Sequence, residues 1–208
     1  MKIPHLILAT ACLLFAGCLP ESINPLSTPA TSAIDPRFEG VYQDSKDAKA
    51  GASYWHFHYR GASALAKGVR RSTTWLEIVN IGHESEGGLD MVRYKALATK
   101  IAGHDYFSFI GLPEDGAIKS AATYSFARYE VTWRGDLRIW IANESAFVAA
   151  VKAGKLRGKV TGGALGASVT LTDTAAHLAA FIAAGDPHQL FAAEPMIFRR
   201  LSGVNARP

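Results

Sequence analysis

Two histidines stand in the sequence at a spacing that suits metal binding. His56 and His58 lie in residues 53–60, where apolar and polar side chains alternate. Because residues i and i+2 of a strand project from the same face, the two imidazoles could share a metal ion. A third ligand would come from His83, His104 or a carboxylate. The alternative is a pair of histidines on a solvated strand face that bind nothing.

The sequence patterns of familiar enzyme sites are incomplete. The chain has no Gly-x-Ser-x-Gly and no Ser-x-x-Lys, and Gly87 stands where a zinc site beginning at His83 would need its second histidine. Residues 154–159 are one residue short of a phosphate-binding loop. The sequence therefore favours a protein that is not an enzyme and needs no cofactor. Serine, histidine and aspartate side chains could still meet in the fold, so an unrecognised hydrolase remains an alternative.

The first residues have the three parts of an export signal. Lys2 supplies the positive charge, residues 6–15 form an apolar run broken only by Thr10, and two small residues precede Cys18. The apolar run is too short to span a bilayer as a helix, which needs about 20 residues. We therefore interpret residues 1–17 as a cleaved signal peptide.

Residues 13–18, Leu-Leu-Phe-Ala-Gly-Cys, resemble the lipobox of bacterial lipoproteins. The resemblance implies cleavage before Cys18 and a lipid on its thiol, with palmitate-type acyl chains. Several acyl chains hold a protein firmly on a membrane, since each buried CH₂ contributes about 0.8 kcal/mol. Leu19 stands where many inner-membrane lipoproteins have Asp, so the resemblance also implies the outer membrane, with the domain facing the periplasm.

The remaining chain divides into a linker, one domain and a tail. Residues 18–34 contain three prolines and no periodic apolar pattern, which predicts a flexible tether. Residues 35–202 form the single domain, and residues 203–208 are a tail. The net charge of +4 is spread along the chain. It excludes a nucleic-acid stripe and supports at most a weak attraction to anionic lipid headgroups.

The apolar pattern of the domain has a period of two up to Glu144, which predicts antiparallel strands. The Gly135-Asp136 pair predicts a tight hairpin turn, with Trp133 on the buried face of the strand before it. Two short helices are expected in the C-terminal third, capped by Asn143 and Asp173. We expect strands at residues 40–43, 53–60, 73–81, 89–99, 106–110, 129–133, 137–141, 156–160, 168–172 and 196–201, and helices at 144–152 and 174–184.

The segment of residues 35–42, Asp-Pro-Arg-Phe-Glu-Gly-Val-Tyr, resembles the opening of lipocalin-type barrels. In that family Gly-x-Trp starts the first strand, and an arginine from a late strand covers the aromatic ring. The resemblance implies a mainly β fold, an antiparallel meander that closes into a lipocalin-like barrel or a strongly curved sheet. It also implies that Arg199 or Arg200 covers Tyr42.

Aromatic side chains in the predicted strands could line an apolar cavity in such a barrel. The candidates are Trp55, Phe57, Tyr59 and Trp133, and the alternative is that they fill the core. We therefore expect a lipid-anchored binding or envelope-assembly module, whose partner is an apolar small ligand or another envelope protein. A periplasmic metal-binding lipoprotein that uses His56 and His58 is the alternative function.

Replacing the predicted anchor residue tests the assignment. We expect Cys18→Ala to abolish acyl labelling, because the apolar run before Cys12 covers only residues 6–8 and is too short for export. The measurement is incorporation of a labelled fatty acid, followed by fractionation of the cells. Cys12→Ala is the matched control and should keep the label. Label that persists on Cys18→Ala would move the anchor to Cys12.

Overall fold

The computed structural model describes residues 19–45, 53–59, 75–83, 88–113, 122–163 and 166–201. The predicted signal peptide, the lipidation of Cys18 and the tail at residues 203–208 lie outside these ranges. For His83 only the backbone is described. Within the described part of the chain no helix is long and apolar enough to cross a membrane.

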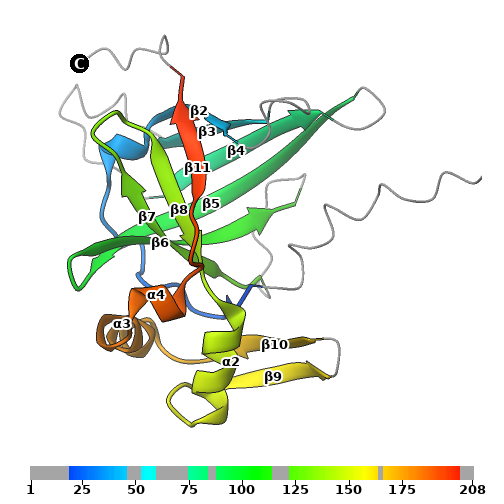
Figure 1. The fold of residues 1–208 in the computed structure, drawn as a ribbon, viewed down its shortest axis with the longest axis vertical. Coiled ribbons are helices and arrows are strands. Elements are labelled where there is room, and N and C mark those ends of the chain that lie inside the picture. Colours follow the sequence, from blue (N-terminus) through cyan, green and yellow to red (C-terminus); the bar gives the residue numbers. More distant parts are fainter. Residues whose placement is uncertain are drawn as a thin grey trace, which may run out of the picture.

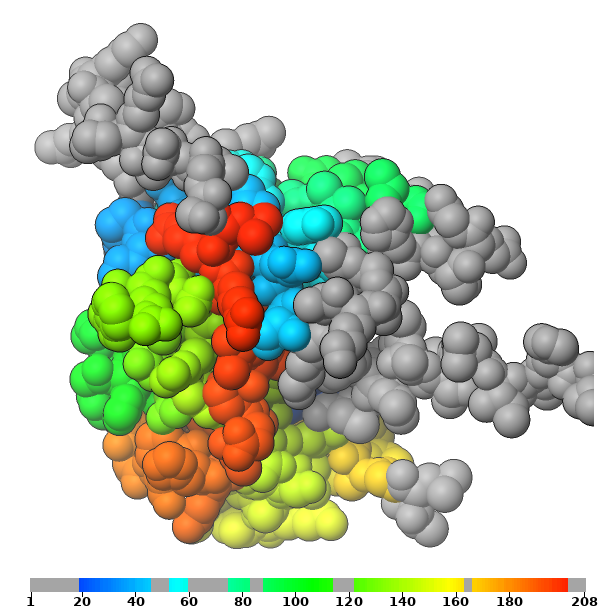
Figure 2. All heavy atoms as spheres, turned by 45° about the horizontal axis from the view of Figure 1, so that its top comes forward, coloured from blue at the N-terminus to red at the C-terminus, as the bar shows by residue number. Residues whose placement is uncertain are grey.

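Eight antiparallel strands form a closed barrel, which confirms the predicted antiparallel meander and, of the two predicted forms, the barrel in place of the curved sheet. Seven strands pair in chain order, and the last strand pairs with both the first and the seventh (Figures 1 and 2). The strands are β2 (Gly40–Asp44), β3 (Tyr54–Tyr59), β4 (Leu76–His83), β5 (Leu89–Ile101), β6 (His104–Leu112), β7 (Ser125–Val131), β8 (Leu137–Ile141) and β11 (Met196–Arg200).

Side chains alternate between the barrel interior and its outer surface, as the period of two predicts. In β3, Phe57 and Tyr59 are buried, whereas Tyr54 and His56 are exposed. One predicted position is wrong. Strand β7 ends at Val131, and Trp133 lies in the following turn with 88% of its surface exposed. Gly135 allows that turn, because its φ of 85° is a left-handed conformation that favours glycine.

A second lobe packs against the outer face of the barrel (Figure 1). It contains the three-stranded sheet β1-β10-β9 and the two predicted helices, together with the short α4, which the sequence patterns did not predict. Its apolar side chains share one core with outward-facing residues of the barrel such as Tyr106 and Phe126. The elements are β1 (Glu21–Ser22), α2 (Glu144–Lys152), β9 (Gly158–Gly163), β10 (Gly166–Leu171), α3 (Ala175–Ala184) and α4 (Pro187–Leu190).

The caps of the two predicted helices differ in their agreement with the sequence. Asn143 caps α2 as expected, since its side chain accepts a hydrogen bond from the backbone N–H of Ser145. The cap of α3 is Thr174, one residue after the predicted Asp173. The carboxylate of Asp173 instead accepts hydrogen bonds from Arg157 and His177. The Asp173 carboxylate therefore forms charge-assisted hydrogen bonds and does not cap the helix.

The prediction of a flexible tether is wrong for residues 19–34. β1 pairs in parallel with β10, and the backbone of Ser22 exchanges hydrogen bonds with that of Tyr124. Leu26 is buried, and its N–H donates to the hydroxyl of Ser108, 2.8 Å away. The N–H of Ala33 donates to the carbonyl of Ala98. We call residues 19–34 the strap. Prolines exclude a helix here, but they do not prevent an extended chain from packing on a surface.

The strap contributes to stability through Leu26. We expect Leu26→Ala to lower the free energy of unfolding by about 2 to 3 kcal/mol, because it removes a buried side chain from the lobe core. Ile23→Ala is the matched control, since Ile23 is 51% exposed and should cost only a few tenths of a kcal/mol. Urea unfolding of both variants measures the difference. Equal, small effects would restore the flexible tether.

Candidate functional site

One end of the barrel is closed by the short helix η1 (Pro36–Phe38), which precedes β2. Phe38 is fully buried and inserts into the barrel interior, where its ring lies 4.2 Å from that of Tyr129 and 5.7 Å from that of Phe57. Asp35 caps the helix and Pro36 begins it, which is a favourable pair at a helix start. We call this end of the barrel the plug.

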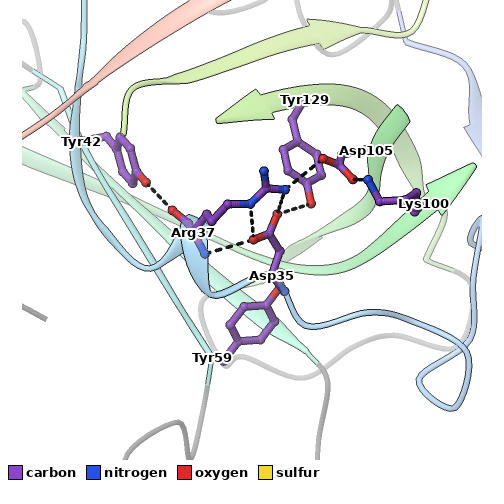
Figure 3. A network of polar contacts seen from close by, with 7 residues as sticks. All are labelled: Asp35, Arg37, Tyr42, Tyr59, Lys100, Asp105 and Tyr129. Carbon is purple, nitrogen blue, oxygen red and sulfur yellow. Dashed lines mark hydrogen bonds and ion pairs between the residues drawn. The ribbon is translucent and has the colours of Figure 1, made fainter. Parts of the chain in front are cut away.

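A network of hydrogen bonds around Asp35 holds the plug in place (Figure 3). The carboxylate of Asp35 accepts from the guanidinium of Arg37 at 2.6 and 2.8 Å, and from the hydroxyl of Tyr129 at 2.9 Å. The backbone N–H of Asp35 donates to the hydroxyl of Tyr59 at 3.0 Å. Two side chains from distant strands therefore fix one residue of the N-terminal chain.

The network extends to the β5–β6 turn. Arg37 also forms an ion pair with Asp105 at 3.0 Å, and Asp105 forms a second one with Lys100 at 2.7 Å. On the other side, the hydroxyl of Tyr42 donates to the carbonyl of Arg37 at 3.2 Å. Positive and negative charges alternate along this series of ion pairs, so each carboxylate contacts at least one positively charged side chain.

The pKa values of the network follow from these contacts. Burial alone would raise the pKa of the Asp35 carboxyl, but the hydrogen bonds from Arg37 and Tyr129 outweigh it and hold the pKa below its usual value. The hydrogen bond to Asp35 raises the pKa of Arg37. Burial and the neighbouring Asp35 charge raise the pKa of Tyr129. At neutral pH the network is therefore a carboxylate, a guanidinium and a neutral phenol, which suits a structural role.

The predicted arginine cover over Tyr42 is present, and Arg200 provides it. The Arg200 guanidinium carbon lies 5.7 Å from the centre of the Tyr42 ring, within the range of a cation–π contact. Its guanidinium also donates to the carbonyl of Glu39, whereas Arg199 is exposed. The side chain of Arg200 packs against Gly135, where an added Cβ would lie 3.1 Å from the arginine Cδ. The end of the chain thus covers the start of the barrel.

The opposite end of the barrel has no comparable polar network among the described residues. Inward-facing apolar side chains there are only half-buried and pack on the core. Trp55 is central to them: its ring stacks on that of Tyr94 at 6.2 Å and meets the edge of Phe198 at 5.4 Å. We call this set the mouth cluster, and its members are Trp55, Tyr94, Phe109, Ile141 and Met196.

The structure divides the four predicted ligand-binding aromatics. Trp55 belongs to the mouth cluster, but Phe57 and Tyr59 are 1% and 2% exposed and fill the core. Trp133 lies outside the barrel, with the guanidinium of Arg134 4.7 Å from its ring. The sequence patterns missed Tyr94, although it stands on the inner face of a predicted strand. Alternation gives the face on which a side chain lies, but not whether that side chain fills the core or lies near an end of the barrel.

His56 and His58 do share a face of β3, as predicted. Their rings are stacked with centres 4.9 Å apart, and the Nε2 atom of His58 lies 3.4 Å from a carboxylate oxygen of Glu77. Burial and the neighbouring His58 lower the pKa of His56. In the described chain no three potential ligands converge as a metal site. His104 is at the start of β6, which two strands separate from β3.

One acid and histidine pair exists in the lobe, as a hydrolase would need. His177 Nδ1 lies 2.8 Å from the buried carboxylate of Asp173. The other hydrogen bonds of that carboxylate come from the backbone and side chain of Arg157, so within the described residues the pair leads to an arginine and to no serine. The contact ties β10 and the start of α3 to the turn before β9.

The fold and its two ends define a closed β-barrel with a polar plug, an apolar mouth cluster and a packed outer lobe. Comparisons with protein-family models, with curated proteins and with solved structures found no match.

The Asp35 carboxylate in the plug makes the free energy of unfolding depend on pH. The pKa of the Asp35 carboxyl is lower in the folded protein than in the unfolded chain, where it is about 3.9. The ionised carboxylate therefore stabilises the fold fully at a pH above about 3.9, and this stabilisation is lost as the pH falls through the lower pKa of the folded state. We expect Asp35→Asn to cost about 2 kcal/mol at pH 7 and less at pH 3. Urea unfolding across this range measures it. Glu194→Gln, at an exposed position, is the control, and a pH-independent difference for Asp35→Asn would contradict the role of its charge.

Proposed function

We propose that this protein is a lipid-anchored, non-enzymatic binding module of the outer membrane that faces the periplasm and binds an apolar small ligand at the mouth cluster. The observation that carries the proposal is the asymmetry of the barrel. One end is closed by a satisfied polar network, and the other presents half-buried apolar side chains on the inner face of the strands.

The shape of the interior limits the kind of ligand. Phe38, Phe57, Phe107 and Tyr129 contact one another across the barrel, so the half next to the plug is filled. The ligand therefore binds shallowly, with its apolar part on Trp55 and Tyr94 and its polar part toward solvent. Such a site selects for apolar area more than for particular hydrogen bonds, because the mouth cluster is mostly hydrocarbon and aromatic surface.

The evidence for the proposed lipid anchor comes from the sequence. Cys18 follows an apolar run and two small residues, and it directly precedes the first described residue, Leu19. Attachment to the membrane would keep the module close to amphiphiles such as lipids, which are the apolar ligands most abundant there. An envelope protein that binds the same apolar side chains is the other partner that the cluster suits.

A fluorescent fatty acid, dansyl-undecanoic acid, tests the mouth cluster. We expect Tyr94→Glu to weaken its binding about tenfold or more, because a carboxylate would have to lose water beside the probe. Tyr54→Glu is the matched control: Tyr54 neighbours Trp55 but lies on the outer face, 40% exposed, and should leave binding unchanged. Fluorescence titration measures both dissociation constants.

A second measurement tests the site without the Tyr94→Glu variant, in case that variant does not fold. Doxyl-labelled stearic acid should quench the tryptophan fluorescence of the unmodified protein, and Trp55→Phe should remove most of that quenching. Binding that is absent, or equally affected by the substitutions at positions 54 and 94, would reject the mouth cluster as the site. A probe that does not bind while an envelope protein crosslinks at Trp55 would favour the protein partner.

A further inference from the structure

The packed strap leaves almost no free chain between the predicted anchor and the folded domain. Leu19 and Pro20 are the only residues between Cys18 and β1, and Pro20 is already buried. Consecutive Cα atoms are about 3.8 Å apart, so the Cα of Cys18 lies within about 11 Å of that of Glu21. This inference rests on the proposed lipid anchor. If Cys18 holds the acyl chains, the lobe must lie at the bilayer surface.

The register of the small sheet shows which face of the lobe accompanies the anchor. Glu21 is opposite Thr170, and Thr170 is opposite Lys159, so these three side chains share one face. Ser22 and Leu171 form the next row and point into the lobe core, where both are fully buried. The first face is therefore the outer face of the sheet, and Glu21 places it close to Cys18.

The chemistry of this part of the lobe suits an anionic surface. Three basic side chains lie in the turn before β9 and on β9 itself, and all three are exposed: Lys155, Arg157 and Lys159. The nearby acids are largely engaged, because Asp173 is buried against Arg157 and His177, and Glu144 accepts from the N–H of Val169. Glu21 is the exposed exception. Ile23, within the strap, is an exposed apolar side chain close to the predicted anchor.

We propose that the lobe surface formed by the outer face of β9 and the turn before it docks on an anionic phospholipid bilayer and orients the barrel on the membrane. The lipid anchor supplies the attachment, and the basic side chains set the orientation through their attraction to the headgroups. The β7–β8 turn, with Trp133, lies at the far end of the molecule from the lobe (Figure 1) and points away from the membrane.

Site-specific fluorescence on the lipidated protein tests the orientation. With Cys18 blocked by lipid and Cys12 removed with the signal, a single new cysteine can carry an NBD label. In vesicles that contain phosphatidylglycerol and a headgroup-spin-labelled lipid, a label at Thr161→Cys on β9 should be quenched several-fold more than one at Trp133→Cys. Equal quenching at both positions, or none at either in membrane-bound protein, would overturn the proposal and leave the anchor intact.

Charge reversal separates the surface from the anchor. The mature chain from residue 18 with Cys18→Ala carries no lipid and should still bind phosphatidylglycerol vesicles in a sedimentation assay. Adding Lys155→Glu and Lys159→Glu should weaken partitioning about 25-fold or more, from about fivefold for each basic side chain. Arg138→Glu with Arg199→Glu makes the same change of net charge on the barrel and should weaken it much less.

The two assays distinguish failure of the docking surface from failure of the proposed lipid anchor. If both charge-reversed proteins partition equally, the attraction depends only on net charge and the docking surface is rejected. If the protein carries no acyl group at all, the proposed anchor fails, and the vesicle assay alone then decides whether the lobe binds anionic lipid. Partitioning that persists in neutral phosphatidylcholine vesicles would also reject the role of the basic side chains.

Discussion

The pairing of β11 with both β2 and β8 is the contact on which the other features of the molecule depend. Without it, two strand edges would expose unpaired backbone groups. The same strand places Phe198 in the barrel interior and brings Arg200 to Tyr42. Because α2, α3, α4, β9 and β10 all lie between β8 and β11 in the chain, the barrel can close only when the lobe has brought the chain back. Folding of the lobe and closure of the barrel are therefore coupled.

The two ends of the barrel are unequal because one of them contains a buried charge. A carboxylate at Asp35 is tolerated only if Arg37 and Tyr129 satisfy it, and these partners must come from fixed positions. The end that contains them is therefore filled by the plug and its hydrogen-bonded partners. The mouth cluster contains no charged side chain, so none of its members needs an opposite charge at a fixed position.

The sequence predicted the features that depend on local pattern and missed those that depend on distant contacts. Alternation placed seven consecutive strands, and the resemblance at residues 35–42 anticipated that an arginine would cover Tyr42. Trp133 was predicted to lie in a strand that extends to residue 133, but β7 ends at Val131. A shift of two residues in the strand end is enough to move this side chain from the strand into the turn. The strap was missed because its few apolar residues, such as Leu26, have no periodicity, and their burial depends on a surface that only the folded barrel and lobe create.

The strap changes what an anchor at Cys18 would do. It begins as a strand of the lobe sheet, contacts the outer face of β6 at Leu26, forms a β-bridge with β5 at Ala33, and leads into the plug at Asp35. The chain passes between lobe and barrel again at Ala142 and before β11, so three covalent connections and one shared core join the two parts. They cannot rotate independently. An anchor at residue 18 would therefore constrain the whole barrel, and the way in which the lobe lay on a membrane would set the direction in which the mouth cluster faces.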